Sequence, residues 1–281
     1  MAIESLSALM EAGSGKDLFE AVVESDCVDR GVTREASVAQ MEALYAAIRR
    51  AGAGYDPALR SHSGMVGGDG ARMRAYAASG KTICGPYMAG VIAQALEMGE
   101  SNACMKCIVA APTAGSCGVL PAVLLYMQNK YSLSDDKIAR ALGVAGIFGN
   151  LIKHNASISG AECGCQAEIG AACSMAAAAM GELTGLSIDE QEYAAEIAME
   201  HHLGLTCDPI CGLVQIPCIE RNAVAAKRAI DASNLAHMLV GTRTISFDMV
   251  VRTMYETGIN MSRAFRETSE GGLARLYSRR G

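Results

Sequence analysis

Apolar residues recur at intervals of three and four along most of this chain, whereas the strict alternation typical of a half-buried strand is scarce. Many of these stretches are rich in alanine, the residue with the highest helix propensity. The spacing predicts helices over residues 36–51, 87–98, 120–130, 135–153, 167–183, 188–202, 219–239 and 247–266. We therefore expect an all-α fold.

Several expected helices have clear end signals. Ser187 and Glu190 have the spacing of a capping box, and Ser134 and Ser246 each stand just before acidic residues at a predicted helix start. Gly185 follows an alanine-rich stretch, which is where a helix C-terminal glycine is expected. These signals sharpen the helix boundaries more than the periodicity does.

No repeat, low-complexity segment or proline-rich linker divides the chain. The first sixty residues are helical in pattern but more charged than the remainder. We therefore expect a helical N-terminal extension over residues 1–60 and one catalytic domain over residues 61–281.

Charge and hydropathy exclude several classes of function. The net charge is −6, and basic residues are not gathered into a cluster, which disfavours nucleic-acid binding. Charged residues interrupt every apolar run before the ~18 residues that a membrane helix needs, and Glu4 and Glu11 are unlike a signal peptide. We expect a soluble cytoplasmic protein, in which the eleven cysteines are packing residues or metal ligands rather than disulfides.

Other motifs give weaker signals. Residues 79–82 resemble the end of a phosphate-binding loop, but Ala75 stands where its first glycine is required. Cys104 and Cys107 have no second CxxC pair, so we interpret them as packing thiols. No HExxH motif occurs, and we expect His201 and His202 to cap a helix C-terminus.

Three segments are dense in Gly, Pro, Asn, Ser and Cys, namely residues 111–118, 154–166 and 207–218. Such segments interrupt helices and leave backbone amides available to a bound group. Cys165, Cys207 and Cys218 lie on these segments, within two residues of a glycine or proline. Their spacing alone leaves two readings open, inert buried thiols or ligands of a metal cluster.

At these segments the sequence resembles the α subunit of the iron-sulfur-dependent L-serine dehydratases. The matching blocks extend from about Ser61 to Ala274. They read SHSGMVGGDGARMRAY, SGKTICGP, VAAPTAGSCGVLPAV, NASISGAECGCQAEIG, AMEHHLGLTCDPICGLVQIPCIERN and MYETGINM with RETSEGGLA. Several blocks in the same order are far more specific than any single motif.

The resemblance implies a [4Fe-4S] cluster held by Cys165, Cys207 and Cys218, with the fourth iron left for substrate. It implies conversion of L-serine to pyruvate and ammonia in a helical domain whose Gly/Pro/Cys-rich loops converge on the cluster. A cluster-dependent lyase acting on L-threonine or L-cysteine is one alternative. A non-catalytic, thiol-rich metal-binding module is another.

The resemblance also implies the substrate-binding residues. They are Thr113, Ala114, Gly115, Asn155, Ser157 and Ser159, although the last three could instead cap helices. Ala114 stands where many members have asparagine, so backbone N–H groups would have to bind the substrate in place of the side-chain amide. His62 is a candidate base, with an ordinary loop histidine as the alternative. Because single-chain members carry an additional N-terminal domain, we expect a separate β subunit as partner.

Overall fold

The computed structural model describes residues 5–12 and 17–278, and in these ranges the protein is all-α, as predicted, with no strand. Short 3₁₀ turns and one π-helical turn, η2 (Gln166–Gly170), join the helices. The α-helices are α1 (Leu6–Ala12), α2 (Leu18–Arg30), α3 (Arg34–Ala53), α4 (Asp69–Ala78), α5 (Gly85–Ala103), α6 (Leu120–Tyr131), α7 (Asp135–Asn155), α8 (Gly160–Cys163), α9 (Ala171–Thr184), α10 (Ile188–Glu200), α11 (Cys218–Leu239), α12 (Phe247–Asn260) and α13 (Gly272–Ser278).

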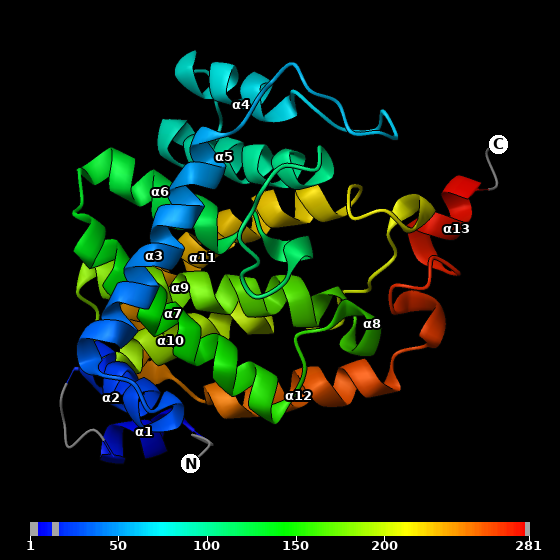
Figure 1. The fold of residues 1–281 in the computed structure, drawn as a ribbon. Coiled ribbons are helices and arrows are strands. Elements are labelled where there is room, and N and C mark those ends of the chain that lie inside the picture. The colour runs from blue at the N-terminus through cyan, green and yellow to red at the C-terminus, as the bar shows by residue number, and fades with distance from the viewer. Residues whose placement is uncertain (1–4, 13–16, 279–281) are drawn as a thin grey trace.

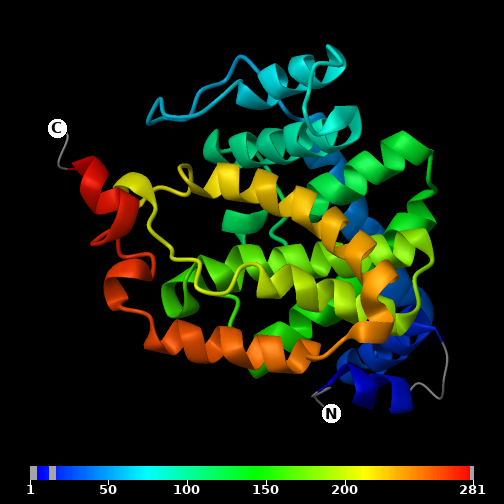
Figure 2. The ribbon, with the colours of Figure 1, turned by 180° about the vertical axis from the view of Figure 1, so that it is seen from behind.

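Helix α9 lies at the centre of the bundle, with α7 on one side and α10 and α11 on the other (Figures 1 and 2). Every residue from Ala171 to Gly181 is buried. A helix that is apolar on all sides is stable only when other helices surround it. The small alanine side chains allow the close approach, and at Gly149 of α7 an added Cβ would lie 2.8 Å from Met175 Sδ.

Two apolar clusters form the core. The larger surrounds α9, α5, α6 and α11, and the smaller joins α2, α7, α10 and α12. In the smaller cluster Phe148 and Phe247 meet edge to face, with ring centroids 5.3 Å apart. Helix α3 adds Tyr45 and Ile48 to the larger cluster. The predicted domain boundary near residue 60 stays a prediction.

The predicted capping signals at helix ends are confirmed. The Glu190 amide donates to Ser187 Oγ over 3.3 Å, and the Ser187 amide donates to Glu190 Oε2 over 2.6 Å. Gly185 ends α9 in the left-handed region at φ 75°. The rings of His201 and His202 donate from Nδ1 to carbonyl oxygens of α10, at 2.9 and 2.7 Å. Because burial lowers the pKa of His202 to about 4, this residue caps the helix as a neutral donor.

One helix prediction was wrong at its end. The pattern predicts a helix to residue 266, but α12 ends at Asn260, and Met261 is extended. The chain turns here because residues 265–267 pair with Cys207. The Cys207 amide donates to the Phe265 carbonyl, and the Glu267 amide donates to the Cys207 carbonyl, both over 2.8 Å. A tertiary contact thus replaces the last turns of the predicted helix.

The glycine- and cysteine-rich segments gather at one end of the bundle. Helix α8, the 207–217 segment and α13 lie on the same side of the molecule (Figure 1). All eleven cysteines are free thiols. Among the described residues, no helix combines the length and the hydropathy that a membrane span requires.

Candidate metal centre

Cys165 lies at the junction between α8 and the π-helical turn η2. Gly164, at φ 76°, provides the turn that precedes it. The next residue, Gln166, is fully buried; its Nε2 donates to the carbonyls of Cys163 and Met254, and its Oε1 accepts from the Gly204 amide. The Gln166 side chain therefore fixes the position of Cys165 relative to α12 and to the segment before Cys207. π-Helical turns occur frequently at functional sites.

Cys207 and Cys218 lie at the two ends of the third irregular segment. The backbone of Cys207 is held on both sides by the pairing with residues 265–267. Cys218 is the first residue of α11. Its carbonyl accepts from Asn222 Nδ2 over 2.7 Å, and the same amide nitrogen donates to the Gly115 carbonyl over 2.7 Å. Asn222 thus connects the start of α11 with the 111–118 segment.

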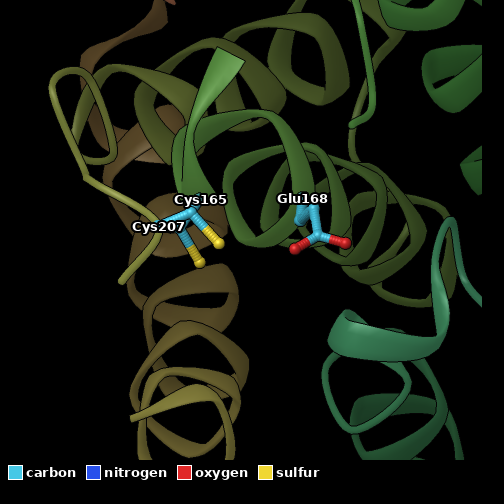
Figure 3. A group of neighbouring side chains, drawn as sticks. All are labelled: Cys165, Glu168 and Cys207. Carbon is cyan, nitrogen blue, oxygen red and sulfur yellow. The ribbon is translucent and has the colours of Figure 1, made fainter. Parts of the chain in front are cut away.

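Two of the three predicted ligands are brought into close proximity, together with a carboxylate. The thiol sulfurs of Cys165 and Cys207 and an oxygen of Glu168 all lie within 4.8 Å of one another. Figure 3 shows both sulfur atoms projecting toward the side on which the Glu168 carboxylate lies. Both cysteines are buried. Such a group of donors can hold a metal ion or cluster.

The electrostatics of the thiol pair favour one thiolate. A hydrogen bond from Cys207, aided by the nearby Arg221 guanidinium, lowers the pKa of Cys165 despite its burial. The same hydrogen bond, together with burial, raises the pKa of Cys207. Cys207 therefore holds its proton more strongly than Cys165 does. Metal binding requires thiolates, and the lowered pKa of Cys165 favours it as a ligand.

Cys218 is buried close to this pair but lies outside the group that meets within 4.8 Å. Burial, followed by the charges of Cys165 and Glu168, raises the pKa of its thiol to about 12. Without a bound cation this thiol is protonated at neutral pH. The role of Cys218 as third ligand stays a prediction.

Glu168 was missed by the sequence analysis. It lies on η2 and is largely buried, which raises the pKa of its carboxyl group, while a hydrogen bond with Thr113 opposes that shift. Two glycines pack closely against this carboxylate. A Cβ added to Gly160 would lie 2.8 Å from Glu168 Oε2 and 3.1 Å from Cys207 Sγ. A Cβ added to Gly115 would lie 3.2 Å from Glu168 Oε1. The sequence signal that could have identified Glu168 is that it is a lone acidic residue in the alanine-rich stretch after Cys165.

The 111–118 segment places Thr113, Ala114 and Gly115 beside this carboxylate. Thr113 caps the 3₁₀ turn η1 (Ala114–Ser116), and Asn102 Nδ2 donates to the Ala114 carbonyl over 3.1 Å. In the described part of the chain, no acceptor is found for the backbone N–H groups of Ala114 and Gly115. These two donors are therefore available to a ligand.

The predicted residues of the 154–166 segment have different environments. Asn155 is the last residue of α7 and is exposed. Ser157 is buried and donates to Glu162 Oε2 over 2.6 Å, so its hydroxyl supports the loop. Ser159 precedes Gly160 at the start of α8, and its side chain makes no capping hydrogen bond. Of the three, Ser159 is next to the glycine that faces Cys207 and Glu168.

His62 is exposed on the loop between residues 61 and 66. The hydroxyls of Ser61 and Ser63 on either side of it donate to Gln215 Oε1, over 3.0 and 2.6 Å. Gln215 lies three residues before Cys218. The His62 loop is therefore attached to the cysteine-bearing segment.

The donor set fits an iron–sulfur cluster better than a hard cation. Thiolates suit iron–sulfur clusters and zinc, whereas Mg²⁺ and Ca²⁺ prefer oxygen ligands. At Gly160 an added Cβ would lie 3.1 Å from Cys207 Sγ, so a side chain there would crowd the thiol. Irregular backbone around the site supplies N–H groups, which commonly bond to cluster sulfides.

Comparisons with known proteins identify relatives of this chain. The family model described as serine dehydratase alpha chain matches residues 13–274. Over 181 residues the chain is 54% identical to L-serine dehydratase 1 of Escherichia coli, covering 64% of this chain and 40% of that protein. The chain thus spans less than half the length of that relative.

Two further relatives match over longer stretches. The L-serine dehydratase of Streptomyces coelicolor is 45% identical over 249 residues, which cover 88% of this chain and 50% of that protein. The probable L-serine dehydratase, alpha chain, of Bacillus subtilis is 43% identical over 217 residues, which cover 77% and 72% respectively. The family match includes all three predicted ligand cysteines, and the chain belongs to the serine dehydratase alpha chain family.

Proposed function

We propose that this chain carries the catalytic site of an L-serine ammonia-lyase, which converts L-serine to pyruvate and ammonia. The observation that carries the proposal is the group of two buried cysteines, Cys165 and Cys207, with the Glu168 carboxylate, which is bordered by two glycines and by the free amides of the 111–118 segment. The names of the relatives support serine as substrate.

We propose that Cys165, Cys207 and Cys218 hold a [4Fe-4S] cluster. Three thiolates leave one iron without a protein ligand, and the chemistry that such a cluster supplies is Lewis acidity toward a leaving hydroxyl. Arg221 compensates part of the negative charge, since its guanidinium interacts with Cys165 and with Asp208.

The protein has to position the substrate so that two bonds can break. In the reaction, the Cα–H bond yields its proton to a base, the C–O bond to the β-hydroxyl breaks, and water leaves. The resulting enamine tautomerises to an imine, which water hydrolyses to pyruvate and ammonia. We expect the amides of Ala114 and Gly115 to bind the substrate carboxylate, aided by Asn155, Ser157 and Ser159, because fixed donors stabilise charge that develops at Cα.

His62 remains our candidate for the base. Its loop is attached through Ser61 and Ser63 to Gln215, so movement of the 207–218 segment and of His62 would be coupled. Histidine is the side chain that most often serves as a general base.

The partner and compartment are also proposals. Because the family model and the Bacillus subtilis relative are described as alpha chains, we propose that a separate β subunit is the partner of this chain. We also propose that the protein is cytoplasmic, because its cysteines are free thiols and the proposed cluster is sensitive to oxygen.

Metal analysis combined with an activity assay tests the proposal. The chain is purified anaerobically, its iron, zinc and acid-labile sulfide are measured, and pyruvate or 2-oxobutyrate is assayed after addition of L-serine, L-threonine or L-cysteine. Iron with sulfide and turnover of serine supports the proposal. Preferential turnover of threonine or cysteine supports the related lyases, and metal without turnover in the presence of the β subunit supports a metal-binding module.

A further inference from the structure

Glu168 has no cationic partner in the described part of the chain. No lysine, arginine or histidine nitrogen lies within 4.0 Å of its carboxylate there. The nearby Arg221 instead donates to the Thr206 carbonyl over 2.7 Å and to Asp208 Oδ1 over 3.0 Å. A largely buried carboxylate without a counter-ion is costly to keep ionised.

The surroundings of Glu168 are otherwise negative. Its charge acts on the thiols of Cys165, Cys207 and Cys218, and the charge of Glu267 acts on Glu168. When the cysteines serve as thiolate ligands, this negative charge increases. The site therefore attracts the cationic group of a ligand more strongly than the neutral or anionic groups of the same ligand.

Two glycines border the Glu168 carboxylate. Gly115 and Gly160 face its two oxygen atoms, and neither position presents a side chain there. The carboxylate is therefore next to both the thiol pair and Gly115, whose N–H group has no acceptor in the described structure. A zwitterion of the size of serine has its ammonium, carboxylate and hydroxyl groups separated by only a few bonds, so it can reach all three features at once.

We propose that Glu168 binds the α-ammonium group of the substrate and thereby restricts the site to amino acids. This inference rests on the proposed function, because it takes serine as the ligand. Two other carboxylates are less suited to the role. Glu267 is exposed, and Glu162 accepts a hydrogen bond from Ser157.

The test compares serine with its analogue that lacks the amino group. The cluster-loaded chain, with its β subunit where the chain requires one, is titrated anaerobically with L-serine and with 3-hydroxypropionate. Binding is followed by rapid mixing from the visible absorption of the cluster. Glu168→Gln should weaken L-serine binding between about tenfold and a hundredfold, as expected for loss of a charged hydrogen bond, and leave 3-hydroxypropionate binding unchanged or stronger.

Glu267→Gln is the matched control, since it removes one negative charge from the same region without removing the buried carboxylate. It should change the dissociation constant of L-serine less than about threefold, as expected for an exposed charge. Glu168→Asp, which keeps the charge, should bind L-serine more tightly than Glu168→Gln. Equal effects of the two glutamine variants would overturn the proposal, because they would indicate a general effect of charge.

Two other outcomes would also overturn the assignment of Glu168. Loss of iron from both Glu168 variants would make Glu168 a ligand or structural support of the cluster. Equal weakening of L-serine and 3-hydroxypropionate binding would indicate a general distortion of the site. A different result would contradict the proposed function itself: the visible absorption of the wild-type cluster would not change when L-serine is added.

Discussion

Arg221 and Asp208 form an ion pair that joins the two cysteine-bearing ends of the 207–218 segment. Arg221 Nη2 lies 3.0 Å from Asp208 Oδ1, and the two side chains are only 18% and 4% exposed. Asp208 directly follows Cys207, and Arg221 lies three residues after Cys218. Asp208 also accepts a hydrogen bond from the Leu273 amide over 2.8 Å, which attaches α13 to the same segment.

Asp208→Asn should therefore destabilise the segment and the cluster. Removing one member of a buried pair leaves an uncompensated charge, which costs about 3 kcal/mol. We expect a lower melting temperature and faster loss of iron to a chelator. Asp69→Asn breaks the exposed pair with Arg72 and should change the free energy of unfolding by less than about 1 kcal/mol. Equal chelation rates for Asp208→Asn and the wild type would contradict this account.

Serine substitutions distinguish the ligand cysteines from the others. Cys165→Ser, Cys207→Ser and Cys218→Ser should each lose most of the bound iron and nearly all activity, because a hydroxyl is a poor substitute for a soft thiolate. Cys104→Ser and Cys107→Ser, at the end of α5, should keep both. Iron and sulfide analysis of the five variants measures this. If Cys104 and Cys107 proved necessary for iron retention, the ligand assignment would be wrong.

The helices were predictable because their signals are local. Ser187 and Glu190 specify a helix start within four residues, and the periodicity of α11 extends over several turns. The end of α12 was not predictable, since it depends on pairing with Cys207, which is distant in sequence.

The site was predictable only in part. The three cysteines are distinguished by their glycine- and proline-rich surroundings and by the resemblance of their motifs to a known family. Glu168 and the Arg221–Asp208 pair gain their meaning from tertiary contacts, because Glu168 meets the thiols through a π-helical turn. A sequence pattern with a period of 3.6 residues does not reveal such a turn.

The free energy of unfolding should depend on pH because of the buried side chain of Glu196. It is fully buried on α10, and its carboxylate oxygens have no hydrogen-bond partner in the described structure. Burial, together with Glu200, raises the pKa of Glu196 from 4.5 to about 7, although Arg243 opposes the shift. The folded state then binds more protons than the unfolded state, so stability falls as pH rises from about 4.5 through 7.

Glu196→Gln should remove this contribution, because the amide does not ionise. Its melting temperature should exceed that of the wild type at pH 8, and the difference should shrink toward pH 5. Glu200→Gln, at the exposed neighbour, should give a smaller effect. Thermal unfolding followed by circular dichroism over this range measures both variants. Parallel curves for Glu196→Gln and the wild type would show that Glu196 is already ionised in the folded protein.

The isolated chain should turn over L-serine poorly even with an intact cluster, because we propose that a β subunit completes the site. The rate should be far below that of L-serine dehydratase 1 of Escherichia coli, of which this chain matches 40%. Steady-state assays of both cluster-loaded proteins under the same conditions make the comparison. Comparable rates would contradict the need for a partner and would strengthen His62 as the base.

Mössbauer spectroscopy of the chain loaded with ⁵⁷Fe tests the central claim, that three cysteines hold a cluster whose remaining iron binds L-serine. We predict a four-iron cluster in which about one quarter of the iron signal shifts when L-serine is added, while the remainder keeps the parameters of thiolate-bound iron. A cluster whose spectrum is unchanged by L-serine, or iron bound without sulfide, would contradict the account.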